Sequence, residues 1–60
     1  MAVGEHEVTA ASLDTAYRDG YRARLGGRPK RTDYEDPDEA FAWFAGWAAA
    51  DAKIWERWPL

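Results

Sequence analysis

The sequence predicts an all-α fold, an antiparallel hairpin of two helices. Two observations carry this prediction: two stretches with apolar residues at helical spacing, and a polar, glycine- and proline-containing stretch between them. With 60 residues, the chain has room for one domain. We expect a flexible tail over residues 1–8 and a single helical-hairpin domain over residues 9–60.

The first helix is expected over about residues 10–26, beginning near Thr9 or Ser12, either of which can cap it. Gly26 and Gly27 form a strong stop signal, because glycine readily adopts the left-handed conformation at a helix end. Apolar and small residues recur along this helix at three- and four-residue spacing: Leu13, Ala16, Tyr17, Gly20, Tyr21 and Leu25.

A loop is expected over residues 27–36 and a second helix over about residues 37–57. Asp36 is a favourable N-cap, Pro37 suits the first helical position, and Glu39 lies where it can close a capping box. Glycine inside a helix costs about 1 kcal/mol relative to alanine. Gly20 and Gly46, each near large aromatic residues, therefore indicate close helix packing or a slot for a ring, with Trp43 and Trp47 as the packing aromatics.

A chain of this size is marginally stable on its own and usually needs a disulfide, a bound metal ion or association with another chain. Cysteine is absent, which excludes a disulfide, and no His/Cys cluster predicts a zinc site. The chain must therefore gain stability mainly by burying its nine aromatic residues. The apolar residues of the second helix span an arc of the helix surface that is too wide for the first helix to cover. We expect part of this arc to meet a second copy or another partner, a surface comprising Phe41, Asp51, Trp55 and Trp58.

Asp51 falls at the centre of this apolar arc, where an unpaired carboxylate would be costly. In an antiparallel hairpin Arg24 would lie beside the start of the second helix, far from Asp51. The Tyr17 hydroxyl is therefore the expected partner, with exposure to water or contact with another subunit as alternatives.

The net charge is -3, but the charges are segregated along the chain. Six of the eight cations lie between Arg18 and Arg31, and an acidic stretch follows directly. Arginine can bind phosphate with two hydrogen bonds, and tyrosine can stack on exposed bases. The candidate residues for binding RNA or another partner are Arg18, Arg22, Arg28, Lys30, Arg31, Tyr21 and Tyr34. The alternative is a solvated face balanced by the neighbouring acids.

No catalytic arrangement, phosphate-cradling glycine loop, metal site or cofactor motif is evident, so a non-enzymatic protein is expected. The first residues do not resemble a signal peptide, and no apolar run approaches the roughly 18 residues of a membrane span. We therefore expect a soluble, cytoplasmic protein without a membrane partner.

The order and spacing of several motifs resemble the ribosome modulation factor family. The matching pattern is Gly20-Tyr21-x-Ala23, Gly27-Arg28-x-Lys30, Tyr34 and Trp43-x-x-Gly46-Trp47-x-x-Ala50. The resemblance implies two helices joined by a loop, and binding to the small ribosomal subunit and ribosomal RNA that leads to inactive, paired ribosomes. Relatives in the same superfamily are described as fluoroquinolone-modifying proteins that act with ATP.

Three functional hypotheses follow. The first is a bacterial, non-enzymatic factor that binds the ribosome or its RNA through the basic segment and regulates translation. The second is a protein-interaction module, such as a phage-encoded inhibitor, that binds a protein partner through its acidic and aromatic surface. The third is an ATP-dependent antibiotic-modifying enzyme, which is less favoured because a hairpin of this size offers little enclosed pocket. Homodimer formation is compatible with all three.

Overall fold

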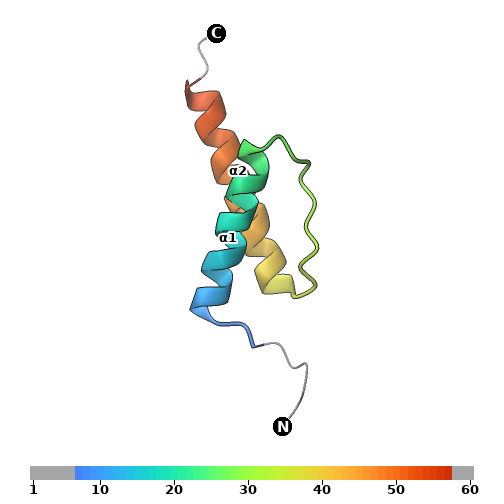
Figure 1. Cartoon of the computed structure of the whole chain (residues 1–60). Helices are drawn as coiled ribbons and strands as arrows, with labels where there is room; N and C mark the ends of the chain where they lie inside the picture. Colours follow the sequence, from blue (N-terminus) through green and yellow to red (C-terminus); the bar gives the residue numbers. More distant parts are fainter. Residues whose placement is uncertain (1–6, 58–60) are drawn as a thin grey trace.

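The computed structural model describes residues 7–57, which form two packed α-helices. Helix α1 spans Ala10–Leu25 and helix α2 spans Pro37–Arg57, with residues 26–36 joining them (Figure 1). The predicted all-α, two-helix fold is confirmed. The first helix ends one residue earlier than expected, and the second has the expected bounds. Residues 1–6 of the predicted tail, and Trp58 of the predicted partner surface, lie outside the described residues.

Thr9 caps the start of α1 and forms a reciprocal pair of hydrogen bonds with Ser12. The Ser12 backbone N–H donates to the Thr9 hydroxyl at 3.0 Å, and the Thr9 N–H donates to the Ser12 hydroxyl at 2.8 Å. Both residues expected as caps therefore act together in one capping box, which satisfies two N–H groups at the helix terminus.

Two glycines end α1 in a Schellman motif. The Arg28 N–H donates to the Ala23 carbonyl at 2.8 Å, and the Gly27 N–H donates to the Arg24 carbonyl at 3.0 Å. Gly27 has a φ of 76°, a value that side-chain-bearing residues rarely adopt. The motif turns the chain sharply at the end of α1 and directs the joining segment back along the molecule.

Asp36 caps α2 through its side chain. One carboxylate oxygen accepts hydrogen bonds from the backbone N–H groups of Asp38 and Glu39, both at 3.0 Å. Pro37 occupies the first helical position, where no N–H donor is needed. Glu39, which donates one of these hydrogen bonds, is buried at 3% exposure.

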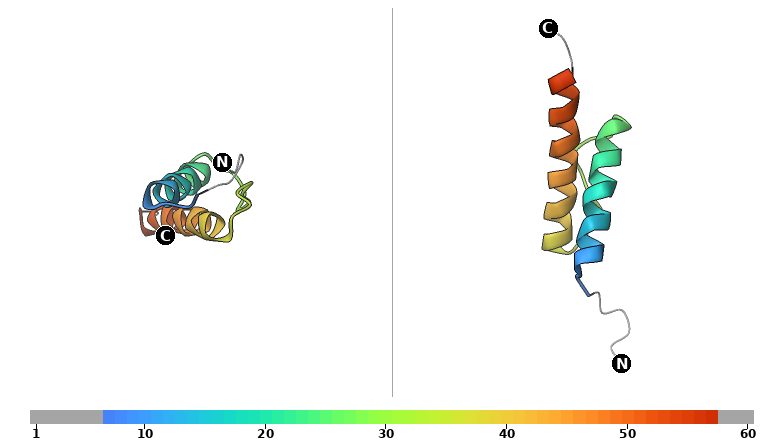
Figure 2. Two further views of the ribbon diagram at one scale, coloured as in Figure 1. Left: turned by 90° about the horizontal axis from the view of Figure 1, so that it is seen from below. Right: turned by 90° about the vertical axis from the view of Figure 1, so that its left-hand side faces the viewer.

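The direction of α2 corrects the predicted antiparallel hairpin. Both helices run the same way, and residues 26–36 return along their side to the level where α1 begins (Figures 1 and 2). Eleven extended residues span at most about 36 Å, whereas the sixteen residues of α1 measure about 24 Å. The joining segment is thus long enough for this return, and α2 extends beyond the end of α1 (Figure 2).

Small residues let the two helix backbones approach closely where they cross. Gly20 lies against the backbone of Trp43, and Gly46 lies against the backbone of Tyr17. Ala16 and Ala50 are fully buried beside them. Because a glycine presents only hydrogen at the contact, neither helix could come this near with a larger residue there. Trp43, 6% exposed, fills the adjoining core.

Candidate nucleic-acid interface

A surface hollow of about 640 Å³ lies between α1, the joining segment and the side of α2. We call it the arginine hollow, because three arginines line it: Arg22 from α1, and Arg28 and Arg31 from the joining segment. Its other lining residues are Asp19, Ala23, Pro29, Thr32, Asp33, Tyr34 and Trp43. The returning segment creates the hollow, since it places residues 28–34 opposite the second half of α1.

The charges of the arginine hollow are unevenly compensated. Three arginines meet two carboxylates there, and all three arginines are exposed. The ion pairs formed among residues 7–57 use other cations: Arg18 with Asp14 at 3.1 Å and Arg24 with Asp51 at 2.8 Å. The arginines of the hollow are therefore available for an anionic ligand, although the chain as a whole is acidic.

Tyr34 links the joining segment to α1 through a hydrogen bond at the hollow. Its hydroxyl donates to an Asp19 carboxylate oxygen at 2.6 Å, and its backbone N–H donates to the Thr32 hydroxyl at 3.2 Å. The hydrogen bond to Asp19 raises the pKa of Tyr34 from its ordinary value of 10.0 to about 12, with burial and the negative charges of Asp19 and Glu39 adding to the effect. The tyrosine ring is thereby held in one position.

This pKa shift predicts a loss of stability in alkali. A raised pKa means that the folded protein holds the phenolic proton more tightly than the unfolded chain. The stabilisation is complete below about pH 10 and is lost as the pH rises through about 12. The pKa can be measured by following tyrosinate absorbance during a pH titration, with Tyr34→Phe used to identify which part of the signal comes from Tyr34. The variant Asp19→Asn is expected to return the pKa of Tyr34 towards its ordinary value of 10.0. An unchanged titration in Asp19→Asn would contradict the assigned cause.

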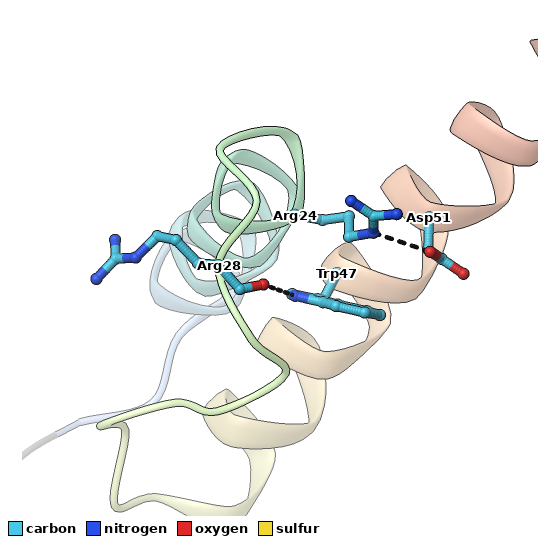
Figure 3. Close-up of polar contacts among 4 residues, drawn as sticks. All are labelled: Arg24, Arg28, Trp47 and Asp51. Carbon is cyan, nitrogen blue, oxygen red and sulfur yellow. Dashed lines mark hydrogen bonds and ion pairs between the residues drawn. The ribbon is translucent and has the colours of Figure 1, made fainter.

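Trp47 links the beginning of the joining segment to α2 through a hydrogen bond. Its indole Nε1–H donates to the Arg28 carbonyl oxygen at 3.0 Å, and the Arg28 side chain extends away from Trp47 (Figure 3). Lys30 places its ammonium 5.9 Å from the ring centroids of both Trp47 and Phe44. The backbone of Arg28 is thus tethered to α2 while its guanidinium remains free to reach a ligand.

Asp51 has a different partner from the one expected. The Arg24 Nε–H donates to its carboxylate at 2.8 Å, and the Arg24 guanidinium also lies 5.4 Å from the Trp47 ring centroid (Figure 3). The expectation that Arg24 lies far from Asp51 was wrong, because the helices are parallel and their C-terminal halves are adjacent. Asp51 is thus engaged within the chain and does not need the Tyr17 hydroxyl or a second subunit.

The remaining predicted binding residues lie apart from the arginine hollow. Arg18 pairs with Asp14 on the exposed side of α1. Lys30 faces the aromatics of α2, and Tyr21 is half-buried without lining the hollow. The structure therefore brings together Arg22, Arg28, Arg31 and Tyr34 out of the seven candidates.

Asp19, Asp33 and Pro29 also line the hollow and were not among the predicted site residues. Asp33 could have been considered from its position beside Tyr34 in the sequence. No local sequence signal connects Asp19 with Tyr34, fifteen residues away.

Large apolar side chains are exposed elsewhere on the molecule. Phe41 is 74% exposed and Trp55 is 61% exposed on α2, and Leu25 is 58% exposed at the end of α1. Phe41 and Trp55 are two of the four residues predicted for a partner surface, whereas Leu25 was not among them. Such side chains can contribute to a protein interface.

Within the described part of the chain, no group of three His, Asp or Glu side chains is placed to hold a metal ion. Neither α1 nor α2 is long and apolar enough to cross a membrane. No protein-family model, curated protein or solved structure matches the chain.

Proposed function

We propose that this chain is a non-enzymatic RNA-binding protein that contacts the phosphate backbone through Arg22, Arg28 and Arg31. The observation that carries the proposal is the convergence of these three arginines on one hollow, with no carboxylate partner among residues 7–57. Charge-assisted hydrogen bonds from arginine to phosphate are stronger than neutral ones and can be bidentate.

The aromatic content of the site favours RNA over an inorganic anion as the ligand. Tyr34 lines the arginine hollow, and its hydrogen bond to Asp19 fixes the position of its ring. Proteins recognise unpaired RNA by combining cationic contacts to phosphate with aromatic surfaces that stack on bases. A site that offers both is suited to a single-stranded segment of RNA.

The resemblance to the ribosome modulation factor family suggests where this RNA is found. The motif Gly27-Arg28-x-Lys30 and Tyr34 both lie in the joining segment, and Arg28 and Tyr34 line the hollow. We therefore propose ribosomal RNA of the small subunit as the ligand, and regulation of translation in bacterial cytoplasm as the role.

The proposal predicts salt-sensitive association of the wild-type protein with small ribosomal subunits. Three phosphate contacts to single-stranded RNA correspond to a slope of about -2 in a plot of log K against log salt concentration. Sedimentation with purified subunits between about 50 and 200 mM salt measures this slope. No association even at about 50 mM salt would contradict the proposal.

A second candidate function is binding of a protein partner, as a phage-encoded inhibitor would do. The exposed Phe41 and Trp55 favour it, because aromatic side chains are enriched at protein interfaces. An affinity pull-down from host lysate separates the two functions. One stoichiometric protein that is retained after nuclease treatment would support this candidate, whereas nuclease-sensitive recovery of ribosomal subunits would support RNA binding.

A further inference from the structure

The two carboxylates of the arginine hollow are in different situations. Asp19 accepts the Tyr34 hydroxyl at 2.6 Å, so one of its oxygens is already engaged. Asp33 is exposed and makes no hydrogen bond or ion pair with another residue in the range 7–57. The hollow therefore combines three available arginines with one available carboxylate.

A carboxylate without a partner would weaken the binding of a ligand that consists of phosphate alone. An ionised carboxylate can only accept hydrogen bonds, and it repels a nearby anion. A nucleotide, however, carries donors as well as its phosphate, at the edge of the base. The exocyclic amino group of cytosine is a donor that carboxylates accept from, whereas uracil presents an acceptor at the same position. Asp33 would thus attract the first base and repel the second.

The hollow is large enough for a whole nucleotide, and its walls can accommodate the base. Its volume of about 640 Å³ falls in the range of pockets that enclose small molecules. Pro29 and the Tyr34 ring supply apolar surface against which a planar base can lie. In an RNA duplex the pairing edge of each base is already used, so a base must be unpaired to present it.

We infer that the arginine hollow receives one unpaired nucleotide whose base carries an exocyclic amino group, with Asp33 accepting a hydrogen bond from that group. Arg22, Arg28 and Arg31 bind the flanking phosphates, and Tyr34 packs on the base. This inference rests on the proposed RNA-binding function and adds base selectivity to it. It predicts that cytidine-containing RNA binds more tightly than uridine-containing RNA of equal length and charge.

The test compares labelled oligocytidylate and oligouridylate of equal length by fluorescence anisotropy at constant salt and neutral pH. The wild-type protein is expected to bind oligocytidylate about tenfold more tightly, equivalent to about 1.4 kcal/mol. In Asp33→Asn the ratio is expected to fall to about one, because an amide can accept from cytosine and donate to uracil equally well. Affinity for oligouridylate is expected to rise, since a repulsive charge is removed.

Glu35→Gln is the matched control, because Glu35 is exposed on the same segment, carries the same charge and does not line the hollow. This variant is expected to keep the wild-type ratio of affinities for oligocytidylate and oligouridylate. Equal wild-type affinity for the two RNAs, or a preference that survives in Asp33→Asn, would overturn the inference while leaving RNA binding itself intact. Absence of binding to either RNA would overturn both the inference and the proposed function.

Discussion

Gly46→Ala is expected to abolish the packed helix pair. A Cβ atom at position 46 would overlap the carbonyl oxygen of Tyr17, and this neighbour is backbone within α1. The two helices would have to separate along their whole contact. Overpacking typically costs about 1–3 kcal/mol and more where the surroundings cannot yield. A chain of 60 residues has only about 3–9 kcal/mol of stability in total.

Thermal unfolding followed by far-ultraviolet circular dichroism measures this effect. Gly46→Ala and Gly20→Ala are expected to lose the cooperative transition of the wild-type protein. Gly26→Ala is the control, because its φ is -84° and an added Cβ would meet the nearest atom at an ordinary 3.4 Å. A cooperative transition in Gly46→Ala at the wild-type temperature would show that the helices do not approach as closely as described.

Replacing Arg22, Arg28 and Arg31 together by alanine is expected to weaken RNA binding about a hundredfold at low salt. Each lost charge-assisted contact contributes about 1 kcal/mol or more, and about 1.4 kcal/mol corresponds to a factor of ten. The salt dependence is expected to flatten as well, because the phosphate contacts that release counterions are gone. Anisotropy titrations with single-stranded RNA at several salt concentrations measure both quantities.

A second triple variant controls for net charge. Arg18, Lys53 and Arg57 are exposed and do not line the hollow, and their replacement by alanine removes the same number of cations. This variant is expected to retain most of the affinity. Equal losses in the two triple variants would mean that overall charge, and not the arginine hollow, determines binding.

The helices themselves were predictable because their signals are local. Asp36 and Pro37 start α2, Gly26 and Gly27 end α1, and the three- and four-residue spacing of apolar residues defines the helical stretches between. The direction of α2 was not predictable in the same way. Residues 26–36 are long enough either to turn tightly or to return along α1, and helical periodicity contains no information about direction.

The composition of the site depends on that direction. The basic block is visible in the sequence, but the parallel arrangement of the helices separates its members. Arg24 pairs with Asp51, and Lys30 lies over the Trp47 ring, whereas the Arg28 side chain extends away from Trp47 (Figure 3). Only the path of the joining segment brings Tyr34 to Asp19, fifteen residues earlier in the sequence. Contacts of this kind follow from tertiary structure and leave no short-range pattern.

Mapping RNA contacts by nuclear magnetic resonance tests the central claim most directly. Titration of the isotope-labelled wild-type protein with a short single-stranded RNA identifies the backbone amides that shift. We predict the largest shifts at Ala23, Arg28, Arg31 and Tyr34 around the arginine hollow, and small shifts at Phe41 and Trp55. Shifts concentrated at Phe41 and Trp55, with none around the hollow, would contradict the assignment of the arginine hollow as the RNA-binding site.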